Sequence, residues 1–314
     1  MVGIFQALMK EPFFSIILPS YNRANHLDTA IGSVLNQMFE NFELIIVDDG
    51  STDSTRLVVE RWNDERISYF FKENEERSIA RNFGISKARG RYINFLDSDD
   101  FFYPHHLETA SKKLTDLDYP PLLHLGFEIR KVSGELIRTY SNYNSKINKE
   151  IINDNLLISS SFFIERIILS QVNFIPSPDA IISEDWCLWL RLAARYPIII
   201  DKTVTNVIIE HPERSLNNLN AENVERSLNL VINTLKADEM VLHVYSTDFN
   251  KFVARNFCFV ALCFSVNGNV EKASHYLSLA HAEYPSIIYT RNYLAVKRKI
   301  IQIKTRKVFR LGNG

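Results

Sequence analysis

Three carboxylates lie close together in the stretch RYINFLDSDD (residues 91–100), where Asp97, Asp99 and Asp100 follow an apolar run. In a β-strand, residues two apart point to the same side, so Asp97 and Asp99 can aim at one point. Two converging carboxylates need a cation, and oxygen ligands favour Mg²⁺ or Mn²⁺. The plainer alternative is that the acids cap a helix opening near Pro104, but a cap needs only one acid. The cluster therefore predicts a divalent-cation site.

A second acidic stretch, VDDGSTDST (residues 47–55), also follows an apolar run. Ser51 or Asp53 suits the N-cap of a helix, which leaves Asp48 and Asp49 upstream of the cap. A carboxylate there accepts hydrogen bonds and would suit a base N–H or a ribose hydroxyl. One of these two acids is therefore a candidate ligand contact.

Two further clusters have a functional and a structural interpretation. Glu184 and Asp185 follow Ser183 in the first turn of a predicted helix, where acids stabilise the helix but could also accept a proton. Arg81 and Asn82 lie near the start of another helix that an anion could approach, and Arg is well suited to bind phosphate. The alternative for Arg81 is an ordinary surface residue.

The elements that must position these residues alternate along the first hundred positions. Short runs of β-branched or aromatic residues alternate with helical patterns, and this alternation predicts a sheet built from βαβ units. The polar clusters follow the first, second and fourth strands, and ligands of parallel α/β sheets bind at the carboxyl ends of strands. The predicted strands cover residues 14–18, 42–47, 66–71 and 92–96.

The pattern changes after Pro104. Residues 121–140 predict a hairpin turning at Ser133 and Gly134, so we expect a mixed sheet with antiparallel additions. Further strands are expected at residues 159–164, 197–200 and 203–209, and a capped helix at residues 183–197. Beyond about Leu216 only helical patterns remain, with NGN (residues 267–269) joining two of them. We therefore expect one domain over residues 1–215 and a helical C-terminal region over residues 216–314.

Four motifs together resemble the family 2 inverting glycosyltransferases with the GT-A fold. They are SIILPSYNR, ELIIVDDGSTDST, ARNFGISKARGRYINFLDSDD and SEDWCLWLRLA, in this order, and the likeness covers residues 13–215. The resemblance implies an α/β fold with a mixed, mostly parallel sheet flanked by helices. It also implies transfer of one sugar from a nucleotide-diphosphate sugar to an acceptor hydroxyl, in the synthesis of polysaccharide or glycoconjugate at the cell surface.

The resemblance implies roles for individual residues. Asp185 matches the general base, with Glu184 as its less favoured neighbour. Asp99 matches a direct ligand of Mn²⁺ or Mg²⁺, Asp97 belongs to the ribose and metal shell, and His211 lies where relatives often have a histidine near the metal. The implied nucleotide-sugar contacts are Pro19, Tyr21, Arg23, Asp49, Arg81, Asn82, Asp97 and Ser98.

The chain departs from the family pattern in two places. Relatives have an Asn and a glycine-containing loop before the helix of Arg81, whereas this chain has NEERS (residues 74–78). The Gln-x-x-Arg-Trp signature of processive polymerases is absent, so one sugar per encounter is expected. UDP is the favoured donor nucleotide, and GDP and dTDP stay open.

Two rival functions stay open. A sugar-phosphate nucleotidyltransferase also uses an α/β sheet and carboxylate-bound Mg²⁺, but it would need a glycine-rich loop where this chain has PSYNRAN (residues 19–25). A scaffold with a vestigial sheet would have no need of Asp97, Asp99 and Asp185 together. Dinucleotide-binding enzymes and P-loop enzymes are disfavoured because neither glycine motif occurs.

The composition of the chain limits the classes of partner and the compartment that we expect. With 36 basic and 37 acidic residues, no overall field would collect nucleic acid. The three cysteines (Cys187, Cys258, Cys263) lack metal-site spacing and fit a reducing cytoplasm. The first residues lack signal-peptide features, and the longest apolar stretch (residues 257–264) is short of the roughly 18 that cross a bilayer. We expect a soluble or peripheral protein.

The C-terminal end has its own charge. Residues 291–314 contain eight Lys or Arg and no acid, so residues 1–290 carry −9 of a whole-chain charge of −1. Val296, Ile300 and Ile303 share one helical face surrounded by basic residues. This composition suits a helix lying on anionic lipid at the inner face of the membrane, which would fit a lipid-linked acceptor. A docked helix with solvated charges is the equal alternative.

Overall fold

The computed structural model describes residues 11–141, 146–212, 214 and 220–311, and side chains up to residue 305. The chain divides into two compact units. The N-terminal unit holds residues 1–148, 156–178 and 195–212, and the C-terminal unit holds residues 149–155, 179–194 and 213–314. The predicted boundary after residue 215 lies outside the described residues.

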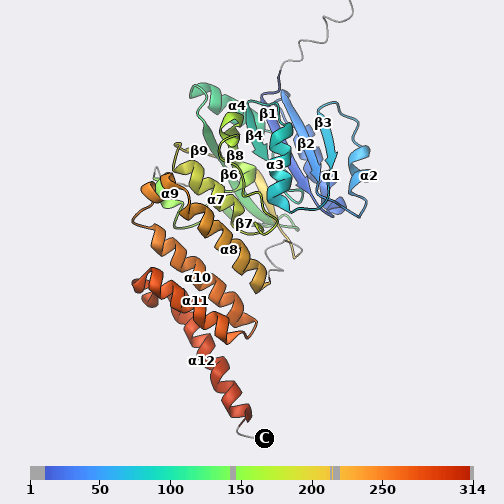
Figure 1. Ribbon diagram of the computed structural model, residues 1–314. Coiled ribbons are helices and arrows are strands. Elements are labelled where there is room, and N and C mark those ends of the chain that lie inside the picture. Colours follow the sequence, from blue (N-terminus) through green and yellow to red (C-terminus); the bar gives the residue numbers. More distant parts are fainter. Residues whose placement is uncertain (1–10, 142–145, 213, 215–219, 312–314) are drawn as a thin grey trace, which may run out of the picture. The chain divides into compact units, whose positions relative to one another are not determined.

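A mixed sheet forms the centre of the N-terminal unit (Figure 1). Its strand order is β3-β2-β1-β4-β8-β6-β9-β5, with β7 paired to β6. The pairs β3–β2, β2–β1, β1–β4 and β6–β9 are parallel, whereas β4–β8, β8–β6, β9–β5 and β6–β7 are antiparallel. The prediction of a mixed α/β sheet is confirmed. The strands are β1 (Phe14–Ser20), β2 (Phe42–Asp48), β3 (Ile67–Phe71), β4 (Tyr92–Phe95), β5 (Phe101–Phe102), β6 (Leu122–Lys131), β7 (Leu136–Tyr140), β8 (Phe162–Glu165) and β9 (Ile199–Glu210).

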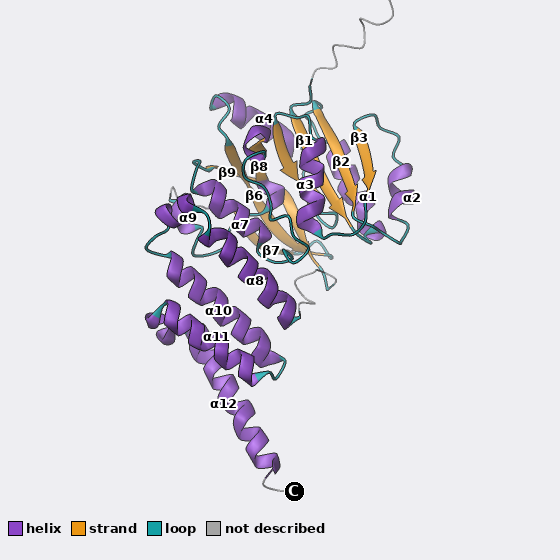
Figure 2. Ribbon diagram, viewed as in Figure 1, coloured by secondary structure: helices purple, strands orange, loops and turns teal. Residues whose placement is uncertain are grey.

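Helices cover both faces of this sheet (Figure 2). The helices of this unit are α1 (Ala24–Leu35), α2 (Thr55–Glu60), α3 (Arg77–Lys87), α4 (His106–Asp116) and α6 (Arg166–Leu169), with a 3₁₀ turn η1 (Ser159–Ser161). The boundary between the units falls within α5 (Ile147–Glu150). Strands β1 and β2 are buried along their whole length, as expected for strands covered on both sides. One apolar cluster joins Ile16 and Leu44 of the sheet to Leu27 of α1 and Leu107 of α4.

Helix α3 packs against β1 and β2. Its close approach depends on Gly84, because a Cβ atom there would lie 2.5 Å from Cγ2 of Ile17. The contact brings the first turns of α3 to the carboxyl ends of the parallel strands, where the polar residues gather.

The described part of the C-terminal unit is helical. It contains α7 (Glu184–Ala193), α8 (Ala221–Lys236), α9 (Glu239–Val244), α10 (Phe249–Val266), α11 (Val270–Glu283), the 3₁₀ turn η3 (Pro285–Tyr289) and α12 (Arg291–Leu311). Asn220, Asp238 and Asn269 cap α8, α9 and α11 through their side chains. The Asp238 cap starts α9 as a helix separate from α8.

Helix α10 has the length and the apolar composition of a membrane span, with a mean hydropathy of 1.3. The expectation of no candidate span counted only uninterrupted apolar residues and overlooked this helix. More than half of it (56%) is buried, as in the core helix of a globular domain. Its buried residues include Val260 and Phe264, which pack with Val296 and Ile300 of α12.

Candidate active site

The acidic loop at the end of β4 separates its carboxylates. Strand β4 ends at Phe95, and the N–H of Asp100 donates to the carbonyl of Asp97 in a turn. Strand alternation therefore does not govern Asp97 and Asp99, contrary to the argument from period-two spacing. Each acid of the loop has a partner from a different element.

Asp97 forms an ion pair with Arg81 of α3. Its Oδ1 lies 2.6 Å from Nη2 of Arg81, whose side chain is 2% exposed. The guanidinium also packs against the rings of Phe95 and Phe174, 6.0 and 5.2 Å from their centroids. Arg81 is therefore not a surface residue, and in this arrangement it fixes Asp97. Its predicted contact with phosphate stays a prediction.

Asp99 faces a histidine at the end of β9. Oδ2 of Asp99 lies 3.0 Å from Nε2 of His211, and both side chains are largely buried. Two neighbouring ligands of an octahedral ion, each bonded at about 2.1 Å, lie about 3.0 Å apart. The same 3.0 Å separation is that of a hydrogen bond between the two side chains. A carboxylate oxygen is a donor that Mn²⁺ and Mg²⁺ prefer, whereas imidazole is more typical of softer first-row ions. The distance is therefore compatible with two ligands of one ion, and the role of both residues as metal ligands stays a prediction.

The fit is incomplete without a substrate. Among the described residues, no three His, Cys, Asp or Glu side chains are grouped so that they could hold a metal ion. Mg²⁺ and similar ions are commonly held by one or two carboxylates, water and substrate phosphates. A site at the Asp99–His211 pair would therefore need substrate phosphates and water to complete it.

Asp100 and Asn82 form hydrogen bonds that connect the acidic loop and α3 to other segments. Oδ1 of Asp100 accepts a hydrogen bond of 2.9 Å from the N–H of Ile209, which ties the acidic loop to β9. Nδ2 of Asn82 donates to the carbonyl of Phe174 at 3.0 Å. Ser98, predicted to contact the nucleotide sugar, is buried at 7% exposure. Asp100 and Asn82 thus anchor the loop and α3.

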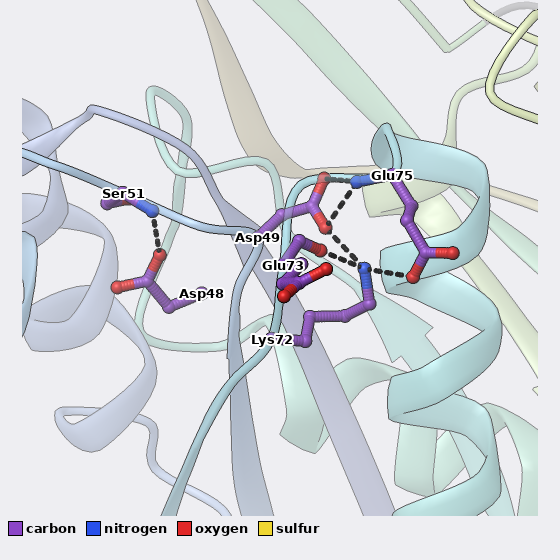
Figure 3. Close-up of polar contacts among 6 residues, drawn as sticks. All are labelled: Asp48, Asp49, Ser51, Lys72, Glu73 and Glu75. Carbon is purple, nitrogen blue, oxygen red and sulfur yellow. Dashed lines mark hydrogen bonds and ion pairs between the residues drawn. The ribbon is translucent and has the colours of Figure 1, made fainter.

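The two acids at the carboxyl end of β2, Asp48 and Asp49, also differ from each other (Figure 3). Asp48 is 1% exposed and accepts hydrogen bonds from the N–H of Ser51 at 2.8 Å and the hydroxyl of Tyr69 at 2.6 Å. Asp49 is paired with Nζ of Lys72 at 2.8 Å and accepts from the N–H of Glu75 at 3.2 Å. Asp48 therefore shapes the turn, and Asp49 joins β2 to the loop that precedes α3.

Lys72 is a site residue that the sequence analysis missed. Burial works to lower the pKa of Lys72, but hydrogen bonds to Asp49 and Glu75 outweigh it, so this pKa is raised. The ammonium therefore stays charged beside the acid expected to bind the base or ribose. The sequence did contain a signal for Lys72. It directly follows the third parallel strand, and ligands of such sheets bind at the carboxyl ends of the strands.

The loop between Lys72 and α3 keeps a glycine-like backbone without glycine. Glu76 has φ 75° and ψ 160°, a region that is almost exclusive to glycine and costs other residues about 1–3 kcal/mol. Its carbonyl accepts the N–H groups of Ile79 and Ala80 at the start of α3. The NEERS segment therefore adopts at Glu76 a backbone conformation that favours glycine, although it contains no glycine.

The loops after β1 and β2 are interlocked. The N–H of Asn22 donates to Oγ of Ser51 at 2.9 Å, and Oδ1 of Asn22 accepts from the N–H of Thr52 at 2.8 Å. Asp53 accepts from the N–H of Ala24 at 3.1 Å. Pro19 is buried in β1, Tyr21 is 48% exposed and Arg23 precedes α1, so these three predicted nucleotide contacts belong to one braced edge.

Asp53 remains ionised in this brace. Burial works to raise the pKa of Asp53, but hydrogen bonds from the Thr55 hydroxyl and from the N–H groups of Ala24 and Thr55 outweigh it, so this pKa is lowered. The carboxylate thus holds both loops in its charged form.

His26 is the second residue that the sequence analysis missed. Its ring, in the first turn of α1, stacks on His211 with centroids 5.1 Å apart and an interplanar angle of 26°. His26 therefore supports the histidine that faces Asp99. Nothing in the local sequence pattern relates two positions 185 residues apart.

The predicted base lies in the C-terminal unit, at the start of α7. Oδ1 of Asp185 accepts hydrogen bonds from the N–H of Trp186 at 2.6 Å and from Nδ2 of Asn155 at 3.3 Å. Glu184 is 3% exposed, whereas Asp185 is only partly buried. Asp185 is thus the more accessible of the two acids, in keeping with the preference for it over Glu184.

The sequence of this chain is similar to those of known glycosyltransferases. The family "Glycosyl transferase family 2" matches residues 15–170, which include β1 to β4 and the acidic loop. The chain belongs to glycosyltransferase family 2. It is 35% identical over 191 residues to an uncharacterised glycosyltransferase of Rickettsia bellii, covering 60% of this chain. It is 43% identical over 101 residues to the putative teichuronic acid biosynthesis glycosyltransferase TuaG of Bacillus subtilis, covering 31% of this chain and 40% of TuaG.

The matched region is a part of longer relatives. The chain spans 27 to 34% of the length of the first curated family members that it matches. The family assignment therefore covers the sheet domain, and the activity of the whole chain is a matter of inference.

Solved structures match the fold of this family member. TarS 1–349 of S. aureus in complex with UDP-GlcNAc superposes with a TM-score of 0.69 at 18% identity, covering 95% of this chain and 92% of TarS 1–349. A mannosyltransferase of Pyrobaculum calidifontis in complex with GDP-Man and Mn²⁺ superposes with a TM-score of 0.55 at 15% identity, covering 96% of this chain and 88% of that chain. The GT-A fold expected from the sequence is confirmed.

Proposed function

We propose that this chain transfers one sugar from a nucleotide-diphosphate sugar, UDP-linked in preference, to an acceptor hydroxyl with inversion at the anomeric carbon. The observation that carries the proposal is the Asp99–His211 pair, 3.0 Å apart beside the carboxyl ends of the parallel strands. Asp99 lies within residues 15–170, which match family 2, and His211 follows β9 outside that match. Asp99 would hold Mn²⁺ or Mg²⁺ through its carboxylate, and His211 would add a nitrogen donor that suits Mn²⁺ better than Mg²⁺.

The donor side is assigned to the braced edge of the sheet. Asp49 would accept from the base or ribose, with Lys72 beside it as a second polar contact. Tyr21 is exposed enough to pack against a base. The UDP-GlcNAc and UDP complexes of TarS support UDP, and the GDP-Man complex keeps GDP as the alternative.

The chemistry is a single in-line displacement. Asp185 takes the proton of the acceptor hydroxyl as its oxygen bonds to the anomeric carbon and the bond from that carbon to the diphosphate breaks. When bound, the divalent ion stabilises the negative charge that develops on the diphosphate. Arg81 holds Asp97 in place within the acidic loop, so this part of the loop does not need to rearrange as charge builds up on the leaving group.

The test is a donor screen with two product assays. The full chain is incubated with Mn²⁺ and UDP-, GDP- or dTDP-linked sugars, and release of nucleoside diphosphate and of pyrophosphate is measured with and without EDTA. We expect metal-dependent release of UDP that is lost in Asp99→Asn. Release of pyrophosphate would indicate a nucleotidyltransferase, and no release from any donor would favour the scaffold. The anomeric configuration of an isolated product tests inversion.

The acceptor is proposed to be a growing cell-surface polysaccharide or glycoconjugate, on the support of the similarity to TuaG. We place the protein in the cytoplasm, with residues 291–314 in contact with the inner face of the membrane. The apolar face expected to meet lipid does not do so at Val296 and Ile300, because both are buried in the protein core with residues of α10. On the other side of the described part of α12, Lys297, Arg298 and Lys304 are exposed. Leu294 and Ile301 are also exposed, at 40% and 52%. This outer face therefore offers both charge and apolar area to anionic lipid.

Flotation with liposomes tests the membrane contact. The full chain should float with vesicles containing anionic phosphatidylglycerol and not with neutral vesicles, because each basic residue near an anionic surface contributes about 1 kcal/mol. Lys297→Glu with Arg298→Glu should abolish flotation. Lys112→Glu with Lys113→Glu, the same change on α4, is the matched control. Equal flotation of both double variants would refute the assignment to α12.

A further inference from the structure

The carboxylate of Asp185 is held by a segment far from it in sequence. Residues 151–155 have no helix or strand, yet the last of them, Asn155, donates its amide N–H to Oδ1 of Asp185 at 3.3 Å. The same oxygen accepts the N–H of Trp186 at 2.6 Å. Two donors from separate segments therefore fix one oxygen of this carboxylate.

The segment itself is anchored at two further points. Nε1 of Trp186 donates to the carbonyl of Ile151 at 2.7 Å, and Nη1 of Arg255 on α10 donates to the carbonyl of Asn153. Ile151 is fully buried. The ring of Trp186 also packs edge-on against Phe252 of α10, with centroids 5.0 Å apart. An irregular stretch is thus held at three of its five residues.

We infer that Asn155 is a positioning residue for Asp185, and that Arg255 acts through it by holding the segment. The inference rests on the proposed role of Asp185 as the base. A partly exposed carboxylate in the first turn of a helix can rotate about its side-chain bonds, and proton transfer requires the oxygen within hydrogen-bond reach of the acceptor hydroxyl. An amide orients the carboxylate without bringing a second charge to it.

A kinetic split separates positioning from a structural role. Asn155→Ala should lower kcat by about tenfold, because a misplaced base slows the chemical step, while KM for the nucleotide sugar changes by less than about twofold. Asn155→Asp, similar in shape, should be slower than Asn155→Ala because it places a like charge against Asp185. Asn153→Ala is the matched control, since the interaction of Asn153 with Arg255 uses its backbone carbonyl. It should keep the kcat of the natural chain.

Double variants test whether the effect passes through Asp185. In an Asp185→Asn background, Asn155→Ala should cause no further loss of kcat, and Arg255→Met with Asn155→Ala should lose less than the product of the two single effects. Additive losses in both combinations would overturn the inference, as would an unchanged kcat in Asn155→Ala. Thermal unfolding of each variant shows that the chain is folded.

The outcomes distinguish this inference from the proposed function. If Asp185→Asn abolishes transfer while Asn155→Ala is fully active, only the positioning role is refuted. If Asp185→Asn itself transfers sugar at the natural rate, the base assignment fails and the positioning role fails with it.

Discussion

Two short acidic stretches, DSDD at the end of β4 and SED at the start of α7, handle neighbouring carboxylates in different ways. In the first, Asp97 pairs with Arg81 of α3, Asp99 with His211 after β9, and Asp100 accepts a backbone N–H from β9. In the second, Glu184 is buried and Asp185 is held by its own helix and by Asn155.

The difference shows that adjacent acids are separated by the geometry of the backbone around them. A turn after a strand sends successive side chains toward different elements, so each acid finds its own partner. Successive residues of a helix point about 100° apart, so one acid enters the protein while the next stays near the surface. Neighbours with the same charge can therefore have different roles. Asp97 and Asp100 hold other elements through Arg81 and Ile209, whereas Asp99 and Asp185 are the proposed metal ligand and the proposed base.

The largest effect expected is loss of transfer when Asp99 is changed. Asp99→Asn should lower kcat/KM about a thousandfold at fixed Mn²⁺, because it removes a charged oxygen ligand that helps to stabilise the leaving diphosphate. The measurement is release of nucleoside diphosphate over a range of Mn²⁺ concentrations. Transfer at the natural rate in this variant would show that the DSDD stretch is not a metal site.

Replacing Asp97 should lower the stability of the folded protein. Asp97→Asn leaves the buried guanidinium of Arg81 without its carboxylate, which should lower the free energy of unfolding by about 2 kcal/mol, less than for a fully buried pair because Asp97 is 30% exposed. Urea denaturation measures this change. Asp116→Asn, the same chemical change in the exposed pair with Lys112, is the control, and equal stability of the two variants would contradict the structural role of Asp97.

Acid should destabilise the N-terminal unit through its buried histidines. Burial lowers the pKa of His124 to about 3 and that of His106 well below its ordinary value. Below about pH 6.5 the unfolded chain therefore binds protons that the folded chain excludes, so stability is complete above that pH and falls as the pH falls. Each histidine should contribute about 1.4 kcal/mol per pH unit.

Urea denaturation between pH 7.5 and pH 5.5 checks this dependence. His124→Gln should reduce the slope, because the side chain no longer titrates. His281→Gln, at an exposed position in the C-terminal unit, should leave the slope unchanged. The same slope in all three proteins would contradict the prediction.

The smallest effect expected concerns Lys72. Lys72→Met removes a nearly buried partner of Asp49 and should lower the free energy of unfolding by about 1 kcal/mol. Lys112→Met, which breaks an ion pair exposed on both sides, is the matched control and should change it by less than about 0.5 kcal/mol. Equal losses measured by urea denaturation would show that the Asp49–Lys72 pair behaves as a surface pair.

Local sequence determined the sheet and its edge. Period-two and apolar runs with turn residues between them predict β1 to β4, and strands of this kind bury both faces and expose polar residues where they end. The prediction of a family 2 domain with the GT-A fold is confirmed for the same reason, because its motifs are local and lie at strand ends. The residues predicted for the site remain assignments for the experiments above.

Tertiary structure decided which atoms meet. Phe174 buries Arg81 from a position 93 residues later, His26 stacks on His211, and Asn155 reaches Asp185 from an irregular segment. The spacing of residues along the chain does not predict any of these pairs. Each pair joins segments that are far apart in sequence and meet only when the hydrophobic cores form. The sequence therefore determined the kinds of residues at the strand ends, and folding determined their partners, since hydrogen bonds and ion pairs depend on distances that only the packed chain sets.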